Sequence, residues 1–432
     1  MSDAGTFRYV GVDLDPSTST VTCRFALGDD DFVETAVLPG GDLTSPGVAE
    51  AAELYCLLAG VSYFKTRAPL RIDLGPLATT HAERSFLTTY FLAGLGEFAL
   101  KNDLDLSGLR IEGPEAGDQA AVGGFDPASV LIPFGGGLDS IVTVAELAPQ
   151  TTRAALFVAE RPGARFEALE AAAAVTGLSV LRAERSLDQK ALSSSAHGYL
   201  NGHVPVTGIL SALGVLTAVA HGFGAVAMSN ERSASSATTV GPFGAVNHQW
   251  SKGAAFEEGF RVMVAARLQG FEYFSWLRNR SEGSIAAVFA TLREYHPVFR
   301  SCNRSFHQDP DARLDHWCGV CDKCLFIDLV LAPYLSAPEL EAIFGPPEPL
   351  ENEDLEDQLA ILVGAHEGTR PFECVGDEAE CAEALLATAR RADRAGSPLV
   401  QRLAAQLSPR PLDEESSPTW IPERYAPRHR LG

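Results

Sequence analysis

The sequence predicts an α/β fold built on a parallel, doubly wound sheet. From residue 128 to about 300, strand-like runs alternate with helix-like runs, as in parallel sheets that carry helices on both faces. The first of these strands runs into three consecutive glycines, a feature typical of anion-binding turns. Hydrophobic residues make up 46% of the 432 residues, so the chain can bury the cores that such a fold requires.

The first 125 residues are expected to form a self-contained N-terminal α/β domain. Three strand-like runs precede two long segments whose apolar residues recur every three or four positions. The strands are predicted at 8–15, 20–27 and 32–38, and the helices at 47–66 and 81–100. Residues 112–127 are rich in glycine, proline and acidic side chains, so we expect a linker there.

Residues 126–300 are expected to form the second domain. Strands are predicted at 128–134, 153–160, 178–184, 225–230 and 271–277, and helices at 140–147, 166–177, 206–223 and 284–295. Ligands bind beyond the carboxyl ends of parallel strands, so the polar segments GGGLDS, SNERS and WLRNRSE should meet at one edge of the sheet. A cysteine-cluster and helical region is expected over 301–405, and an extended tail over 406–432.

Charge and hydropathy exclude several classes of function. The net charge of −22 disfavours nucleic-acid binding, which needs a basic surface, and suits an enzyme that acts on small molecules. The most apolar stretch, 208–228, is interrupted by His221 and several glycines, so no membrane segment is expected. The N-terminus lacks the basic start and apolar core of a signal peptide, which predicts a cytoplasmic protein with reduced or metal-bound cysteines. The sequence indicates no oligomeric state.

The glycine-rich segment GGGLDS, residues 135–140, resembles the PP-loop Ser-Gly-Gly-x-Asp-Ser of ATP pyrophosphatases. Gly136, Gly137, Asp139 and Ser140 match that motif, and Gly135 replaces its first serine, which removes one hydroxyl contact. The resemblance implies that ATP is split between its α and β phosphates and that an adenylated substrate is left. An ordinary glycine-rich turn between a strand and a helix is the alternative.

Four cysteines have the spacing of a metal site. Cys318, Cys321 and Cys324 are separated by two-residue gaps, and Cys302 lies upstream. Four thiolates complete a tetrahedral zinc shell, so a structural zinc ion is expected, with an iron–sulfur cluster or unligated thiols as alternatives. A similar cysteine array follows the PP-loop domain of 7-cyano-7-deazaguanine synthases.

Further strings spread along the chain resemble one family. Together with the glycine segment and CGVCDKC, they are similar to the UDP-N-acetylmuramoyl-L-alanyl-L-glutamate epimerases, and they read SYFKTRAP (62–69), MSNERSAS (228–235), NHQWSK (247–252) and RPFECVGDEAEC (370–381). The resemblance implies that ATP and Mg²⁺ serve to invert the terminal glutamate of UDP-MurNAc-L-Ala-L-Glu through an acyl-adenylate, with release of AMP and diphosphate. Another adenylating ligase or amidotransferase of the deazaguanine-synthase type, or a non-catalytic nucleotide-binding regulator, is the alternative.

The cofactor-binding residues are expected around the glycine turn and after the fourth strand of the second domain. Gly135, Gly136, Gly137 and Ser140 would contact phosphate, while Asp139 would orient the turn or bind Mg²⁺. In the segment Asn230–Arg232, Glu231 is a candidate Mg²⁺ ligand and Arg232 a candidate for bidentate binding of phosphate or carboxylate. A polar helix cap with a surface ion pair is the alternative for this segment.

Proton transfer and substrate binding have several candidates. Cys374 and His203 are candidates for the base that removes the α-proton. For Cys374 a buried structural thiol is the favoured interpretation, because the adjacent Glu373 disfavours a thiolate. For His203 the favoured interpretation is a core histidine. His248 and Lys252 would reach the α-phosphate or else lie in a solvated loop. A surface ion pair is favoured over a substrate contact for Arg278 and Glu282, and Lys65 is either exposed or bound to the UDP or peptide acid.

Overall fold

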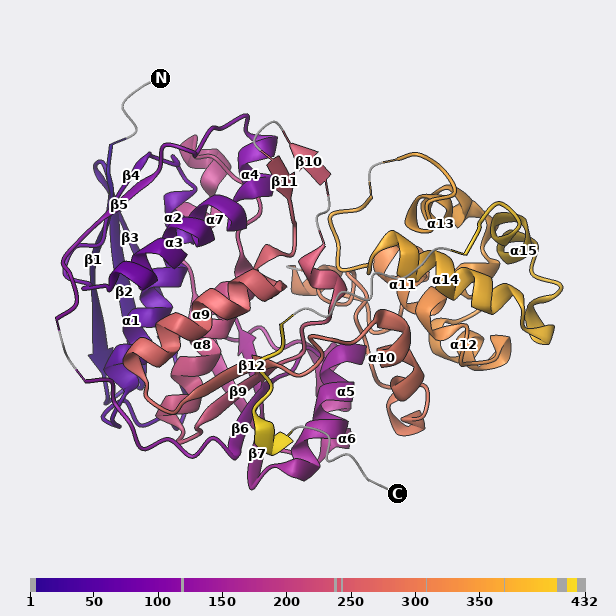
Figure 1. Ribbon diagram of the computed structural model, residues 1–432, viewed down its shortest axis with the longest axis horizontal. Helices are drawn as coiled ribbons and strands as arrows, with labels where there is room; N and C mark the ends of the chain where they lie inside the picture. Colours follow the sequence, from indigo (N-terminus) through magenta and orange to yellow (C-terminus); the bar gives the residue numbers. More distant parts are fainter. Residues whose placement is uncertain are drawn as a thin grey trace.

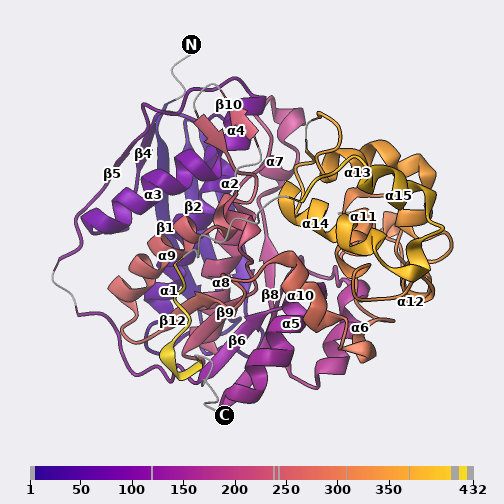
Figure 2. The ribbon, with the colours of Figure 1, turned by 45° about the vertical axis from the view of Figure 1, so that its right-hand side comes forward.

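The computed structural model describes residues 5–117, 120–236, 239–241, 244–307, 309–368, 370–409 and 418–425. It is a mixed α/β structure in which one ten-stranded sheet runs through the larger part of the molecule (Figure 1). The C-terminal helices lie together beside this part, and the turned view separates the two groups clearly (Figure 2). The linker prediction falls partly, at 118–119, and the tail prediction largely, at 410–417 and 426–432, outside the described residues.

Five parallel strands confirm the predicted alternation. They are β6 (Ser129–Pro133), β7 (Arg153–Glu160), β8 (Val180–Ser186), β9 (Ala225–Met228) and β12 (Glu272–Ser275). Their order in the sheet is β8–β7–β6–β9–β12, so the chain first adds strands on one side of β6 and then returns to its other side. The reversal creates a switch point between the carboxyl ends of β6 and β9, where open α/β sheets bind ligands.

The sheet separates two hydrophobic cores. Along β6, Leu131 contributes to one core while Val130 and Ile132 contribute to the other, as the two-residue period of a strand requires. The helices on the first face are α1 (Val48–Ala59), α2 (Val61–Phe64), α3 (His81–Gly94), α4 (Gly96–Lys101), α8 (Val206–Ala220) and α9 (Ala254–Arg267). Those on the second face are α5 (Leu138–Leu147), α6 (Glu167–Thr176) and α10 (Glu282–Phe289).

The N-terminal strands extend the same sheet, in contrast to the self-contained region expected from the sequence. They are β1 (Phe7–Asp15), β2 (Thr20–Leu27), β3 (Asp30–Val37), β4 (Arg71–Asp73) and β5 (Arg110–Glu112). The strand β3 pairs antiparallel with β8 and thereby covers what would otherwise be an open edge of the parallel sheet. Periodicity along a strand does not reveal its neighbour, so the sequence did not indicate this join. The domain boundaries at 125, 300 and 405 stay predictions.

The remaining elements lie mostly toward the C-terminus. They are α7 (Gln189–Leu192), the hairpin β10 (Thr239–Gly241) and β11 (Gly244–Val246), α11 (Asp322–Leu331), α12 (Ala337–Phe344), α13 (Glu356–Leu362), α14 (Glu378–Ala389) and α15 (Pro398–Ala404). The described part of the tail returns to the sheet, because Tyr425 is buried in the second core and its hydroxyl donates to the carbonyl of Pro127 at 2.9 Å.

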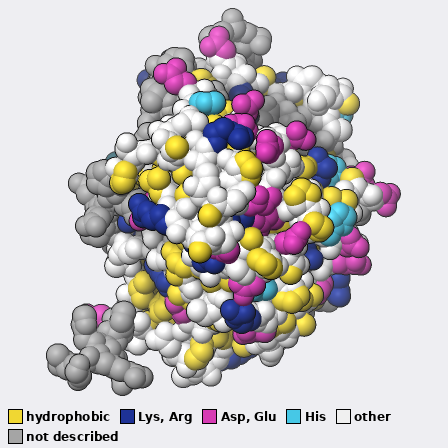
Figure 3. Space-filling model, turned by 90° about the vertical axis from the view of Figure 1, so that its right-hand side faces the viewer, with side chains coloured by type: hydrophobic (Ala, Val, Ile, Leu, Met, Phe, Trp, Pro, Cys, Tyr) yellow, Lys and Arg dark blue, Asp and Glu magenta, His cyan; other side chains and the backbone are white. Residues whose placement is uncertain are grey.

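Two findings agree with the charge and hydropathy of the sequence. Among the described helices, none combines the length and apolarity needed to cross a bilayer. On the face formed by the C-terminal helices, lysine and arginine side chains stand apart among acidic and apolar ones (Figure 3). Proteins that bind nucleic acid gather such groups into a patch or stripe, so this face does not have that character.

A buried ion pair fastens the junction between β3 and β8. Glu34 on β3 is fully buried, and both of its oxygens accept from Arg185 on β8, at 2.7 and 3.1 Å. The hydroxyls of Tyr55 and Tyr63 donate to the same carboxylate at 2.5 and 2.9 Å. The carboxylate therefore depends on three partners from different elements, and its charge is balanced by one guanidinium.

We expect Arg185→Met to lower the free energy of unfolding by about 3–5 kcal/mol, because it leaves the charge of Glu34 buried without a counter-charge. The double variant Glu34→Gln/Arg185→Met removes both charges and keeps an amide oxygen for the tyrosines, so it should recover most of the loss. Urea unfolding followed by fluorescence measures both variants. A double variant no more stable than Arg185→Met would contradict this role of the ion pair.

Candidate active site

A cavity of about 450 Å³ lies at the switch point of the sheet. Its walls come from the turn after β6, the ends of β7 and β9, and segments near residues 252, 301, 323 and 374. The sequence-predicted residues that line it are Gly135, Gly137, Asp139, Ser140, Asn230, Lys252 and Cys374. The cavity thus joins residues separated by more than half of the chain.

The glycine turn allows the backbone to face the cavity closely. Gly136 has a φ of +71°, and a Cβ there would lie 2.9 Å from the Cβ of Leu169, so both conformation and packing require glycine. A Cβ on Gly135 would meet nothing within 4 Å, because this residue opens into space. Gly137 is the N-cap of α5 and has no side chain to cap the first-turn amides, which therefore remain available to an anion.

Three carboxylates stand beside the turn: Glu231 and Glu282 are buried, and Asp139 is half-buried. Burial raises the pKa of Asp139 to about 6, and the charge of Glu231 adds to the rise while Lys323 and Lys252 oppose it. Burial, followed by the charges of Glu231 and Asp139, likewise raises the pKa of Glu282. These shifts indicate that the three carboxylates repel one another, and oxygen ligands with surplus negative charge are suited to a divalent cation such as Mg²⁺.

Two lysines compensate part of this charge and converge on Cys374. The Nζ of Lys252 donates to the Sγ of Cys374 at 3.0 Å, and the Nζ of Lys323 donates to the backbone carbonyl of Cys374. Burial by itself lowers the pKa of Lys252, but the charges on Cys374, Glu231 and Asp139 raise it above its ordinary value. A charged amine at hydrogen-bond distance is the kind of neighbour that stabilises a thiolate.

The residues after β9 and β12 are more deeply buried than the sequence suggested. The interpretation of Arg278 and Glu282 as a surface pair is wrong, since Arg278 is 0% and Glu282 is 6% exposed. Arg278 pairs with Glu257 at 2.8 Å and donates to the carbonyls of Glu231 and Lys252, so it fixes two backbone segments of the cavity wall. The alternation of hydropathy along the sequence does not predict that an arginine is buried and bonded to two backbone segments.

The other residues after β9 have defined partners. The amide of Asn230 donates to the Oγ of Ser275 at 3.2 Å, which ties the end of β9 to β12. Arg232 pairs with Glu380 at 2.9 Å, and both side chains are largely buried, which excludes the surface ion pair considered for this segment. Burial raises the pKa of Glu380 to about 7, with a further rise from Asp377 and a lowering by Arg232.

The two predicted histidines lie together but do not line the cavity. The ring centroids of His203 and His248 are 4.2 Å apart, and the Nδ1 of His248 contacts the carboxylate of Glu97. Burial, assisted by the charge of His248, lowers the pKa of His203 to about 4. Burial by itself raises the pKa of Glu97, but hydrogen bonds from His248 and Lys101 bring it down to about 2.

The four predicted cysteines form the cluster that the sequence indicated. The sulfurs of Cys302, Cys318, Cys321 and Cys324 all lie within 4.8 Å of one another. The Sγ of Cys324 is 3.4 Å from that of Cys321 and 3.6 Å from that of Cys318. A tetrahedral zinc ion with Zn–S bonds of about 2.3 Å would separate its sulfurs by about 3.8 Å, so the arrangement fits zinc closely.

Sequence analysis missed two residues that the structure brings to these clusters. Lys323 lines the cavity, and its position between Cys321 and Cys324 was the signal available, because a metal knuckle fixes the residues inside it. Glu97 joins the histidine cluster from the first turn of α4, where a buried glutamate followed four residues later by Lys101 has the same spacing as any surface pair.

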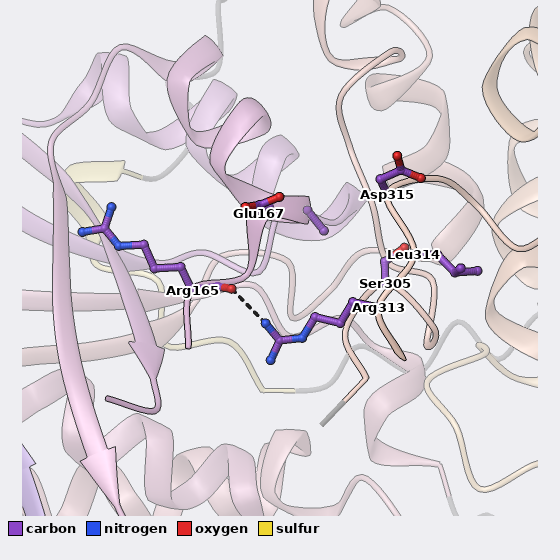
Figure 4. A pocket seen from close by; sticks show the side chains of 7 residues that line it. Arg165, Glu167, Ser305, Arg313, Leu314 and Asp315 are labelled. Atoms are coloured by element: carbon purple, nitrogen blue, oxygen red, sulfur yellow. Dashed lines mark hydrogen bonds between the residues drawn. The ribbon is translucent and has the colours of Figure 1, made fainter. Parts of the chain in front are cut away.

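Two further cavities flank the first. One, of about 620 Å³, shares Ala159, Phe166 and Leu210 with it and is lined by the basic residues Lys65, Arg161 and Arg185. The other, of about 430 Å³, lies between the start of α6 and the 305–315 loop. Figure 4 shows Arg313 of that loop reaching the carbonyl of Arg165, a hydrogen bond of 2.8 Å.

Comparisons with known proteins cover nearly the whole chain. Residues 1–276 match the MurL N-terminal domain and residues 298–417 match the MurL C-terminal domain. The UDP-N-acetyl-alpha-D-muramoyl-L-alanyl-L-glutamate epimerase of Xanthomonas oryzae pv. oryzae is 36% identical in an alignment of 426 residues that covers 94% of this chain and 90% of that protein. A protein of the same name from Salinispora tropica is 34% identical over 98% of this chain and 95% of its own length. Another, from a Micromonospora species, is 35% identical over 93% of this chain and 90% of its own length. No solved structure matches the chain.

We expect Asp139→Asn to stabilise the ligand-free protein by about 2 kcal/mol above pH 6. The folded-state pKa of Asp139, about 6, exceeds the usual value of about 4, so the wild-type protein loses stability as the pH rises through this window, whereas asparagine does not titrate. Urea unfolding between pH 4.5 and 8 measures the difference, with the exposed Asp103→Asn as the matched control. A stabilisation that grows as the pH falls would contradict the assignment.

Proposed function

The chain belongs to the MurL family of UDP-MurNAc-L-alanyl-L-glutamate epimerases, and from this membership we propose that it inverts the terminal L-glutamate of UDP-MurNAc-L-Ala-L-Glu in an ATP-dependent reaction. We place this step in peptidoglycan precursor synthesis and in the cytoplasm, the compartment that supplies ATP. The observation that carries the mechanism is the contact between Lys252 and Cys374 in the same cavity as the glycine turn.

ATP would make an inert C–H bond acidic. Removing the α-proton of a free carboxylate gives a doubly charged enediolate, which is very unfavourable. In the proposed first step the carboxylate oxygen attacks the α-phosphorus of ATP, the bond to the β-phosphate breaks, and diphosphate leaves. The acyl-adenylate no longer carries the carboxylate charge, and its carbonyl withdraws electrons from the α-carbon. The α-proton can then be removed and returned to the opposite face, and water finally releases AMP.

The glycine turn suits the proposed phosphate site. Gly135 opens into the cavity, and the first-turn amides of α5 supply unfilled donors at the positive end of a helix. Ser140 donates to the carbonyl of Gly137 at 3.0 Å, so its hydroxyl already lies at the turn. The strand order 3-2-1-4-5 of β6, β7, β8, β9 and β12 is that of doubly wound nucleotide-binding folds, and it supports the assignment of a PP-loop.

Charged side chains would stabilise the phosphates during adenylation. Lys252 and Lys323 line the cavity from different segments, and each would stabilise negative charge that develops at the α-phosphate. Asp139 and Glu231, with Glu282 behind them, are the residues that would hold Mg²⁺, which when bound would neutralise phosphate charge. Arg232 is engaged by Glu380, so its proposed contact with phosphate or carboxylate requires that pair to open.

Cys374 is the favoured base for the α-proton. It lines the cavity and accepts from a charged lysine, whereas neither His203 nor His248 is among the described residues that line it. Glu373, expected to oppose a thiolate at Cys374, accepts from the amide of Asn303 at 3.0 Å. Cysteine is suited to this task when a neighbouring cation stabilises its ionised form.

The neighbouring cavity is suited to the rest of the substrate. It shares three lining residues with the first cavity, so a ligand can extend from one into the other. Lys65 and Arg161 line the neighbouring cavity beside Glu160 and the Arg185 that Glu34 already pairs, and a UDP-linked peptide carries phosphates that require basic partners. We propose that the UDP-muramoyl portion occupies this cavity and that the terminal glutamate reaches Cys374. The relatives are all named epimerases, which disfavours the ligase and regulator alternatives.

We expect the full-length protein, incubated in heavy water with ATP, Mg²⁺ and UDP-MurNAc-L-Ala-L-Glu, to place deuterium at the glutamate α-carbon and to form one AMP per turnover. Mass spectrometry detects the label, and chiral analysis after hydrolysis detects D-glutamate. The matched control replaces ATP with a non-cleavable α,β-methylene analogue, which should prevent labelling. Epimerisation that proceeds equally well with the analogue would contradict the adenylation step.

We expect Cys374→Ser to lower the rate of α-proton exchange by about 10²–10⁴-fold, because the hydroxyl is a far weaker base in the same position. Adenylation does not need this base, so substrate-dependent exchange of labelled diphosphate into ATP should persist. The control is Cys381→Ala, which alters a buried cysteine that is not part of the cavity lining. Loss of both activities in Cys374→Ser, with the fold intact, would show that the thiol is not the base.

A further inference from the structure

A second group of metal-ligating side chains lies outside the cysteine cluster. Glu97 comes from α4, His203 from the loop that precedes α8, and His248 from the loop that precedes α9. One donor atom of each residue lies within 4.8 Å of the donor atoms of the other two. Three segments far apart in the sequence therefore bring a carboxylate and two imidazoles to one point.

The donor set has the composition of a zinc site with open coordination. Two histidines and one glutamate form the protein shell of several catalytic zinc sites, and substrate or water completes the coordination there. Glu97 is 4% exposed, and one of its oxygens faces the Nδ1 of His248 while the other accepts from Lys101. Lys101 thereby fixes the carboxylate and leaves the oxygen on the histidine side for an ion, which is the usual task of a residue behind a ligand.

The group of Glu97, His203 and His248 lies next to the segment that carries Phe372 and Cys374. The ring of Phe372 lies 5.9 Å from that of His248, and the Nζ of Lys101 lies 4.8 Å from the same phenyl ring. Phe372 is two residues before Cys374, so the group adjoins the segment that carries the proposed base. Phe372, His203 and His248 are each half-buried, so the group is only partly accessible to solvent.

We propose that Glu97, His203 and His248 bind one divalent transition-metal ion, with zinc as the preferred ion, in addition to the ion of the four cysteines. Three protein donors leave one coordination position for a water molecule or for a carboxylate or phosphate oxygen. The ion would also fasten α4 to the two loops and to the Phe372 segment. This proposal does not depend on the epimerase reaction and is tested without it.

The experiment uses the full-length protein with its cysteine cluster saturated with zinc. After dialysis against metal-free buffer, cobalt(II) is added and its visible d–d absorption is followed. We expect one further equivalent to bind, without the thiolate-to-cobalt charge-transfer band that cysteine ligands produce. His203→Ala should weaken this binding by more than about 100-fold, and Glu97→Gln, which keeps the shape of the side chain, should weaken it as well.

Two variants distinguish ligation from a general effect on folding. His203→Cys restores a donor, so binding should return together with a thiolate charge-transfer band that reports the residue directly. His197→Ala removes an exposed histidine from the same region and should bind cobalt like the wild-type protein. The proposal is overturned if the wild-type protein binds no second equivalent, or if His203→Ala and the wild-type protein bind cobalt equally while both remain folded by circular dichroism.

Discussion

The compensation of buried charge behind the glycine turn is the constraint on which the cavity depends. Burial and the charge of Glu231 raise the pKa of both Asp139 and Glu282. Lys323 offsets only part of the rise at each carboxylate, and Lys252 offsets part of it at Asp139. The site therefore holds surplus negative charge beside the glycine turn, an arrangement that a bound cation would stabilise. The same surplus makes the empty site less stable than an uncharged one, as is common where strain or charge is kept for function.

The backbone around these charges is held by residues that do not themselves face the cavity. Arg278 is fully buried and donates to the backbone carbonyls of Glu231 and Lys252, while Glu257 balances its charge. One guanidinium thus ties the backbone at Glu231 to the backbone at Lys252. The cysteine cluster acts in a similar way from the C-terminal side, because Lys323 lies between two of its ligands and its ammonium group reaches Cys374. A metal ion there would therefore position an active-site lysine without taking part in chemistry.

Much of this arrangement follows from the sequence. The parts that do not follow from it have one physical reason in common. The five parallel strands, the glycine turn and the four cysteines are local patterns, and local patterns are readable because each residue's role is fixed by its neighbours in the chain. The pairing of β3 with β8, the burial of Arg278 and the approach of Glu97 to two histidines all join segments with long separations. Periodicity gives the face of an element but not its partner, so a buried arginine and an exposed one have the same local signature.

The shared sheet explains why the N-terminal region and the nucleotide-type fold occur together. The antiparallel addition of β3 places the Glu34–Arg185 pair at the junction, and Arg185 also lines the cavity that adjoins the glycine turn. On the same side, Lys65 follows α2 and donates to Asn201 at 2.7 Å, next to the loop that carries His203. A parallel sheet alone would end at the open edge of β8, without Lys65 and without the carboxylate of Glu34 that balances Arg185. The N-terminal region therefore does more than cover an edge: Ser62 and Lys65, in and just after α2, line the second cavity, and Glu34 on β3 holds the Arg185 that lines it as well.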